Sequence, residues 1–166
     1  MRIGIGYDSH RFVPDQVTMG DGAVQRLGGV PITGCPKLVG HSDADVLIHA
    51  IIDALLGAAA LGDIGSHFPD TDSRWHNANS ADMLCSVVKK IGDAGYAVGN
   101  IDATVLCERP KLRPFIDKIR SCLAECLDVP IGSVSVKGKT NEGMDAVGEG
   151  RGIAVHAVAL LVPVER

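Results

Sequence analysis

Apolar and polar positions recur along the chain at two spacings, one typical of strands and the other typical of helices. Near the N-terminus, Ile3, Ile5 and Tyr7 alternate with glycines, which predicts a strand. Gly28 and Gly29 separate two short apolar runs, which predicts a hairpin. Strands are expected over residues 2–7, 24–27, 30–32, 100–107, 133–139 and 153–162.

The longer segments between these strands carry helical spacing and helix end signals. Ser42 is followed three residues later by Asp45, and this pair predicts a capping box that opens the first helix. That helix is expected to continue to about Leu61, where Gly62 would end it. Helices are expected over residues 42–61, 80–94 and 115–127.

The order of these elements predicts an α+β fold in a single domain over residues 1–166. Strands spaced by helices, ending in two successive strands, favour a four-stranded mixed sheet with helices packed on one face. The last strand is apolar on both sides, with Val155 and Ala157 representing one side and Val158 and Leu160 the other. Such a strand is typical of burial between helices and a partner subunit, so we expect a homo-oligomer.

Composition limits the class of function. The chain has 166 residues, 46% hydrophobic and 22% charged, enough for one apolar core. Its net charge of −4 argues against a nucleic-acid partner, although Arg109, Lys111 and Arg113 form a basic group suited to a small phosphorylated ligand. No run approaches the roughly 18 apolar residues that span a membrane, and no leader pattern precedes the first strand. We therefore expect a soluble cytoplasmic protein with no membrane partner, whose five cysteines are reduced.

Two segments carry candidate metal ligands. Asp8 and His10 are two residues apart on the first predicted strand, so they share a face and can point at one ion. The third ligand is either His41, just outside the first helix, or His49, within it, and the spacing leaves both open. Two histidines and a carboxylate would leave zinc one open position, as catalytic zinc sites do.

The first predicted helix also suggests a rival enzyme. Asp45, His49 and Asp53 are four residues apart and form a polar stripe. A metal-dependent phosphohydrolase could use this stripe with a zinc-activated water. A solvated face is the ordinary alternative for the stripe, and for His67, His76 and His156 we favour surface or packed positions.

Six segments, in this order, make the chain closely resemble the 2-C-methyl-D-erythritol 2,4-cyclodiphosphate synthase family, and the likeness covers almost the whole chain. The segments are Gly6 to Phe12, His41 to Asp45 with His49, Asp53 to Gly65, Phe68 to Asp72, Arg109 to Leu112 and Lys137 to Glu142. The resemblance implies a homotrimer similar in fold to the trimeric chorismate mutases, with sheets packed around the three-fold axis. Each active site would lie between neighbouring subunits.

The same resemblance implies the reaction and its cofactors. The 2-phosphate of 4-diphosphocytidyl-2-C-methyl-D-erythritol 2-phosphate would attack the β-phosphorus, releasing CMP and closing a cyclic diphosphate of the non-mevalonate isoprenoid pathway. Asp8, His10 and His49 would hold zinc, and Glu142 would approach a second ion, Mg²⁺ or Mn²⁺. His41 and Thr140 would stabilise the transition state.

The matched segments also imply how the substrate is held. The residues from Asp63 to Gly65 and from Phe68 to Asp72 resemble a mobile loop that binds the erythritol unit. The residues from Cys107 to Arg113 and from Lys139 to Glu142 resemble the neighbouring subunit's cytidine and phosphate pocket. The implied substrate-binding set is Asp8, Ser9, His10, His41, Ser42, Asp63, Ile64, Gly65, Phe68, Pro69, Asp70, Thr71, Asp72, Cys107, Arg109, Pro110, Lys111, Leu112, Arg113, Lys139, Thr140, Asn141 and Glu142.

Two regions depart from the family pattern. Many members carry an aromatic residue and an arginine near the trimer axis, where a terpenyl diphosphate has been proposed to bind. This chain has Ala146 and Glu149 there, with Arg151 displaced, so we expect weak or no such binding. The stretch from Val13 to Gln25 is also longer than usual. A non-catalytic oligomeric scaffold of the same fold is a second rival to the synthase, because fold does not fix function.

Overall fold

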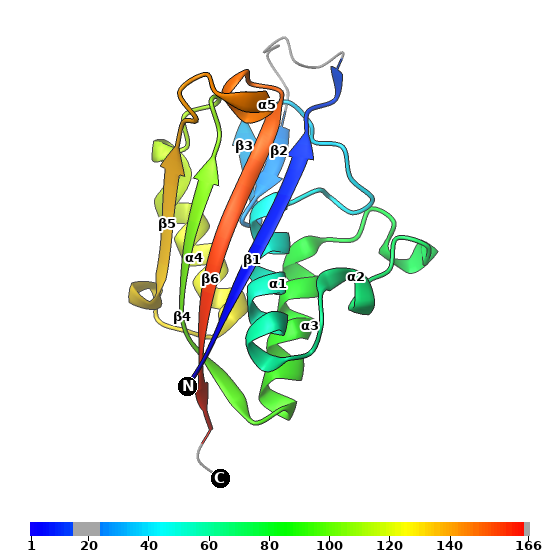
Figure 1. The fold of residues 1–166 in the computed structure, drawn as a ribbon, viewed down its shortest axis with the longest axis vertical. Helices are drawn as coiled ribbons and strands as arrows, with labels where there is room; N and C mark the ends of the chain where they lie inside the picture. Colours follow the sequence, from blue (N-terminus) through cyan, green and yellow to red (C-terminus); the bar gives the residue numbers. More distant parts are fainter. Residues whose placement is uncertain (15–23, 165–166) are drawn as a thin grey trace.

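A four-stranded mixed sheet forms one layer of the computed structural model, which describes residues 1–14 and 24–164 (Figure 1). Its strands are β1 (Arg2–Arg11), β4 (Tyr96–Leu106), β5 (Val134–Lys139) and β6 (Gly152–Pro163). They lie in the order β1, β6, β4, β5; β1 and β4 run antiparallel to β6, and β5 runs parallel to β4. A separate hairpin pairs β2 (Val24–Leu27) with β3 (Val30–Thr33).

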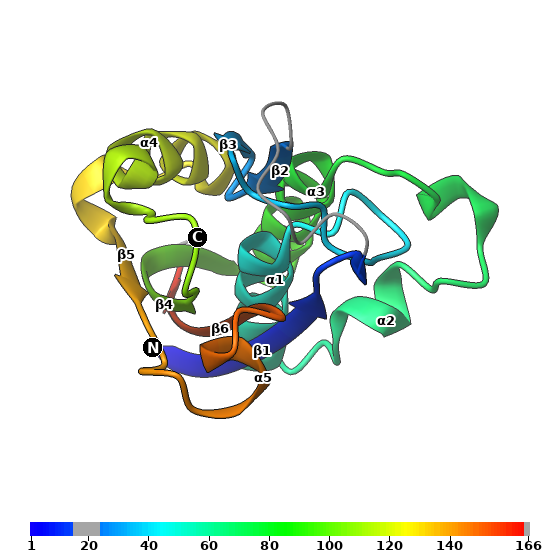
Figure 2. The same cartoon turned by 90° about the horizontal axis from the view of Figure 1, so that it is seen from above.

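Three long helices cover one face of this sheet (Figure 2). They are α1 (Val46–Ala59), α3 (Ser80–Asp93) and α4 (Ile116–Leu127). Two single-turn helices, α2 (Ile64–His67) and α5 (Asp145–Gly148), lie in the connections, together with short 3-10 turns at Ser73–Trp75, Arg113–Phe115 and Ile131–Ser133. The predicted mixed sheet with helices on one face is confirmed. Within the described residues, no helix has the length and apolar character needed to cross a lipid bilayer.

The face of the sheet opposite the helices is open in the single chain and partly apolar. Ile3 and Ile5 are 74% and 72% exposed there, and Val158 of β6 is exposed beside them. The other side of β6, with Val155 and Ala157, is fully buried against the helices. The last strand is therefore apolar on both sides, as expected. The helices cover one side, and the other side remains available to a partner.

Strand β1 lies against α1 with its backbone in close contact, because Gly4 and Gly6 have no side chains on that face. A Cβ atom on Gly6 would overlap the carbonyl oxygen of Ala50 and lie 2.7 Å from the amide nitrogen of Ala54. A Cβ atom on Gly4 would meet α1 one turn later, at Ala54 and Ala58. The glycines that alternate along this strand thus set the distance between β1 and α1.

Helix α1 begins and ends differently from the prediction. Ala44 has a φ of 54°, in the left-handed region, so the helix cannot extend back through it. Asp45 is the N-cap, and the capping box expected at Ser42 is wrong. At the other end, Ala60 takes the left-handed conformation with a φ of 58°, so the helix ends before Gly62.

Smaller differences occur elsewhere. Strand β4 begins at Tyr96 rather than at residue 100, and β1 continues to Arg11. The expected loop over residues 62–72 contains α2, and the glycine-rich turn before β6 contains α5. Most of the long stretch from Val13 to Gln25 lies outside the described residues.

The close contact of β1 with α1 predicts opposite effects for two glycine substitutions. Gly6→Ala should lower the free energy of unfolding by about 3 kcal/mol, because the new methyl group overlaps backbone that cannot move alone. Gly57→Ala, on the exposed side of α1, should raise it by about 0.5–1 kcal/mol, since alanine favours helix and the nearest atom is 3.9 Å away. Urea unfolding measures both. Equal stability of the two variants would contradict this packing.

Candidate metal centre and surrounding cavities

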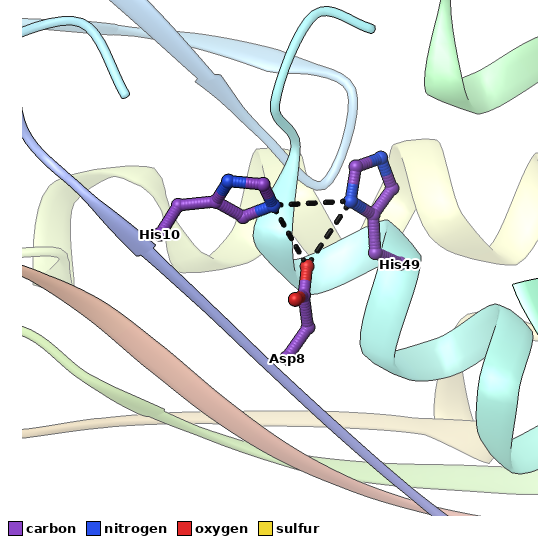
Figure 3. A group of neighbouring side chains, drawn as sticks. All are labelled: Asp8, His10 and His49. Carbon is purple, nitrogen blue, oxygen red and sulfur yellow. Dashed lines mark hydrogen bonds and ion pairs between the residues drawn. The ribbon is translucent and has the colours of Figure 1, made fainter. Parts of the chain in front are cut away.

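Asp8 and His10 on β1 and His49 on α1 point toward one another (Figure 3). Asp8 Oδ2 lies 3.0 Å from His10 Nε2 and 3.1 Å from His49 Nδ1, and the two ring nitrogens are 3.4 Å apart. The shared face expected for Asp8 and His10 is therefore present. Among the described residues, the group that could hold a metal ion consists of these three, so the structure favours His49 over His41 as the third ligand.

The spacing of the three atoms fits a small tetrahedral cation. Ligand atoms at about 2.0–2.1 Å from such an ion are about 3.3 Å from one another. The three observed separations, 3.0, 3.1 and 3.4 Å, form one face of such a tetrahedron. One carboxylate and two imidazoles leave the fourth direction open to another ligand. The chain's own residues thus fit a metal ion with one position open to a further ligand.

Backbone contacts fix the orientation of His10. Its Nδ1 is 2.5 Å from the carbonyl oxygen of Val39, so Nδ1–H donates there and the Nε2 lone pair is left facing Asp8. The Val39 amide in turn donates to the Arg11 carbonyl at 2.9 Å. A Cβ atom on Gly40 would lie 3.2 Å from His10 Cε1, so the glycine lets this segment approach the ring.

Asp8 and His10 each stabilise the charged form of the other. Burial alone would raise the pKa of the Asp8 carboxyl, but hydrogen bonds and charge from His10 and His49 outweigh it and hold that pKa well below its usual range. Burial would lower the pKa of His10, but the Asp8 carboxylate and the Val39 carbonyl raise it. Asp8 therefore remains an anion at neutral pH and attracts positive charge to this point, from a ring proton or from a cation.

The outer nitrogen of His49 contacts two serines. His49 Nε2 is 3.0 Å from Ser80 Oγ and 3.1 Å from Ser42 Oγ. Ser42 is one of the residues implied by the resemblance, whereas sequence reasoning treated Ser80 only as the start of a helix. Nothing in the local pattern could have revealed it, because the contact with His49 spans 31 positions.

A cavity of about 410 Å³ opens beside the triad, within the range of small-molecule sites. It brings together His41, Ser42 and five residues of the expected erythritol loop. Trp75 and Met83 line it as well, and sequence reasoning missed both. Its lining residues are Asp8, His10, His41, Ser42, His49, Asp53, Ile64, Gly65, Phe68, Pro69, Asp70, Trp75 and Met83.

Three other residues of the expected loop are not in this lining. The Asp63 carboxylate accepts hydrogen bonds from the amide and hydroxyl of Ser66, at 2.8 and 2.7 Å, and caps α2. Asp72 forms an ion pair with Arg74, with 2.6 Å between Oδ2 and Nη2. Thr71 lies in the turn directly before Asp72. Asp63 and Asp72 thus have local structural partners.

The polar stripe expected on α1 is divided by the structure. Asp45 is fully buried and accepts hydrogen bonds from the amides of Gly28 and Gly29, at 2.8 and 2.7 Å, so it ties the hairpin to the helix. Burial raises the pKa of Asp45, although these amides oppose that rise. Asp53 does line the cavity and accepts a hydrogen bond from the Ile64 amide at 2.7 Å. The metal site that the rival hydrolase would build on Asp45 is therefore wrong.

A second cavity, also of about 410 Å³, lies beside β5 at the far edge of the sheet. Cys107, Lys111, Leu112, Arg113, Lys139 and Thr140 line it, as the resemblance implied, together with Glu108, Ile116, Val136, Lys137 and Gly138. Asn141 and Glu142 follow directly, and the Glu142 carboxylate accepts a hydrogen bond from the Thr140 hydroxyl at 2.5 Å. Arg109 and Pro110 are in the turn before Lys111, where both carbonyls face the Cys107 thiol.

A larger cavity, of about 800 Å³, lies toward the open face of the sheet and includes Ser9, Ala146 and Arg151. We place the metal centre in the smaller cavity beside α1, because that cavity contains all three ligands. Ser9 points away from Asp8 and His10, since it occupies the alternate position on β1. Glu149 forms an ion pair with Arg151 at 2.8 Å, which offsets part of the charge expected to repel a diphosphate.

Known proteins are similar to this chain along nearly its whole length. The 2-C-methyl-D-erythritol 2,4-cyclodiphosphate synthase of Salinibacter ruber is 52% identical over 161 residues, covering 97% of this chain and 98% of that protein. The structure of IspF from Plasmodium falciparum in complex with CDP is similar, with a TM-score of 0.84, 34% identity and coverage of 99% and 97%. The bifunctional IspDF from Campylobacter jejuni has a TM-score of 0.89 and 37% identity, and this chain covers 42% of that longer chain. The YgbB family model matches residues 1–162, and the chain therefore belongs to the YgbB family.

Proposed function

We propose that this chain is a 2-C-methyl-D-erythritol 2,4-cyclodiphosphate synthase. It converts 4-diphosphocytidyl-2-C-methyl-D-erythritol 2-phosphate to the cyclic diphosphate and CMP, for isoprenoid precursor biosynthesis by the non-mevalonate pathway. The observation that carries this proposal is the triad of Asp8, His10 and His49 at the wall of a ligand-sized cavity, in a chain so similar to named synthases.

Charge repulsion is the main barrier in this reaction, and the two cavities supply groups that counter it. The attacking phosphate has a second pKa of about 6, so it is already largely anionic at neutral pH and needs no strong base. An anion that attacks an anionic diphosphate needs positive charge and fixed geometry instead. His41 and Thr140 would donate hydrogen bonds to the phosphoryl oxygens. Expulsion of CMP and ring closure then balance without water.

The triad would hold Zn²⁺, since its donor set and spacing suit that ion and leave one direction open. Bound there, zinc would act as a Lewis acid on a phosphate oxygen and orient it. Glu142 would face a second ion, Mg²⁺ or Mn²⁺, together with the diphosphate, because carboxylate and phosphate oxygens are the ligands such ions prefer. The Glu142 carboxylate is exposed beside Thr140, which supports this placement.

The complete site requires two subunits. The triad adjoins β1 and the basic cavity adjoins β5, the two opposite edges of the sheet. Three strand spacings, roughly 14 Å, separate these edges. The strand registers align Asp8 with Val155, Val105 and Gly138, so both groups lie toward the same end of the sheet. In a homotrimer of the chorismate-mutase type, packed through the open faces of the sheets, one subunit's triad would meet its neighbour's cytidine pocket. The exposed Ile3, Ile5 and Val158 support this assembly.

The cytoplasm is the compartment that we propose. All five cysteines lie within the described residues and are free thiols, which is typical of a reducing environment.

The proposed triad predicts how much zinc the protein contains. The purified chain should contain about one zinc ion per subunit, and Asp8→Ala should contain little, because one of three ligands is lost. Elemental analysis after dialysis against zinc-buffered solution measures this. Asp102→Ala is the control, since Asp102 is on β4 and pairs with Lys137. Full zinc content in Asp8→Ala would contradict the site.

The proposed shared active site predicts that two inactive variants restore activity when mixed. His49→Ala and Thr140→Ala should each be inactive alone, while an equal mixture reassembled from unfolded chains should regain about one quarter of wild-type activity. Random mixing places an intact triad against an intact partner pocket in that fraction of sites. CMP release measures the outcome. A mixture as inactive as its components would show that each site lies within one subunit.

A further inference from the structure

We propose that Ser80 and Asp43 are positioning residues for the metal, which determine which nitrogen of His49 carries the proton. This inference rests on the proposed metal at the triad. It concerns two side chains that the resemblance did not assign. The direction of each hydrogen bond between Asp43, Ser80 and His49 determines where that proton lies.

The ring of His49 must place its proton on one side only. Nδ1 faces Asp8 Oδ2 and His10 Nε2, at 3.1 and 3.4 Å, and would therefore be the metal-binding nitrogen. A neutral imidazole that binds a metal through Nδ1 carries its hydrogen on Nε2, and that hydrogen needs an acceptor. Ser80 Oγ lies 3.0 Å from Nε2.

The hydroxyl of Ser80 is oriented to accept this hydrogen. Its own hydrogen is donated to Asp43 Oδ1 in a short hydrogen bond, and its backbone amide donates to Asp43 Oδ2 at 3.2 Å. The oxygen lone pairs of Ser80 are therefore left facing His49. The resulting order is a ring N–H that donates to a hydroxyl, which donates to a carboxylate.

Burial distinguishes Ser80 from Ser42, the other neighbour of Nε2. Ser80 is completely buried, so no water competes for its hydroxyl. Ser42 Oγ lies 3.1 Å from Nε2, but it lines the cavity and also accepts a hydrogen bond from the Ala44 amide at 3.3 Å. Ser42 is thus accessible to substrate, whereas Ser80 has only protein partners.

Backbone hydrogen bonds hold the Asp43 carboxylate in place. The Asp43 amide donates to the Ala78 carbonyl at 3.1 Å, and the Asp45 amide donates to Asp43 Oδ1 at 3.3 Å. The Asn77 amide also donates to the His41 carbonyl at 2.9 Å. These bonds join the segment before α1 to the segment before α3. A carboxylate fixed behind the hydroxyl makes His49 a stronger and better oriented ligand.

The test compares zinc affinity in Ser80→Ala and Ser86→Ala, measured by competition with a chromogenic chelator. Ser86 is an exposed serine on the same helix, so its removal should change nothing. Ser80→Ala should bind zinc about 10–100-fold more weakly. The start of α3 is retained, because Asn79 Oδ1 still accepts a hydrogen bond from the Ala81 amide at 3.1 Å. Asp43→Asn should weaken zinc binding less, since its amide oxygen can still accept from the hydroxyl.

A second readout reports the proton directly. In the zinc-loaded wild type, the His49 Nε2–H signal in a ¹H–¹⁵N spectrum should exchange slowly with water, and in Ser80→Ala it should exchange faster. Unchanged zinc affinity and unchanged exchange would overturn the proposal. If Ser80→Ala does not fold, as judged by circular dichroism, Asp43→Asn decides by the same two criteria. Zinc affinity is independent of turnover, so a wild type that binds zinc but releases no CMP would refute the synthase alone.

Discussion

The close backbone contact between β1 and α1 is the constraint on which the candidate metal centre depends. Asp8 and His10 follow Gly6 on the strand, and His49 precedes Ala50, the residue whose carbonyl a Gly6 side chain would overlap. The atoms that meet at the triad therefore come from two elements whose separation is set by missing side chains. His49 Nδ1 and Asp8 Oδ2 are 3.1 Å apart, a separation that suits two ligands of one small ion. Any widening of the contact between β1 and α1 would increase this separation.

The start of α1 is organised by two carboxylates with different tasks. Asp45 is buried and binds the hairpin amides, which fixes the helix against β2 and β3. Asp43 turns the other way and binds Ser80, which fixes the helix against the start of α3. His49 lies one helical turn beyond Asp45, and its amide donates to the Asp45 carbonyl at 3.0 Å. His49, the proposed metal ligand, is thus supported from two sides, and such support matters because small shifts in ligand position cost activity.

Much of the fold and part of the site could be predicted from the sequence. The predictions that succeeded rest on local signals, and those that failed concern backbone conformation or tertiary packing. The glycine alternation of β1 and the helical spacing of α3 and α4 are local signals, and these elements appear within a few residues of their expected bounds. The predicted start of α1 is wrong because Ala44 adopts a left-handed conformation, which is not expected for alanine. Asp45 looked like a site residue because periodicity shows a shared face but not what covers it. Ser80 was missed because its contact with His49 depends on tertiary packing.

The fate of solvent oxygen during turnover tests most directly whether the substrate's own phosphate, and not water, is the nucleophile. The protein is incubated with 4-diphosphocytidyl-2-C-methyl-D-erythritol 2-phosphate, Mg²⁺ and Zn²⁺ in ¹⁸O-labelled water, and the products are followed by ³¹P NMR. The proposed synthase should form CMP and a cyclic diphosphate without label, since the substrate's own phosphate is the nucleophile. Labelled, non-cyclic phosphate products would contradict it and establish a hydrolase that activates water at the same metal centre.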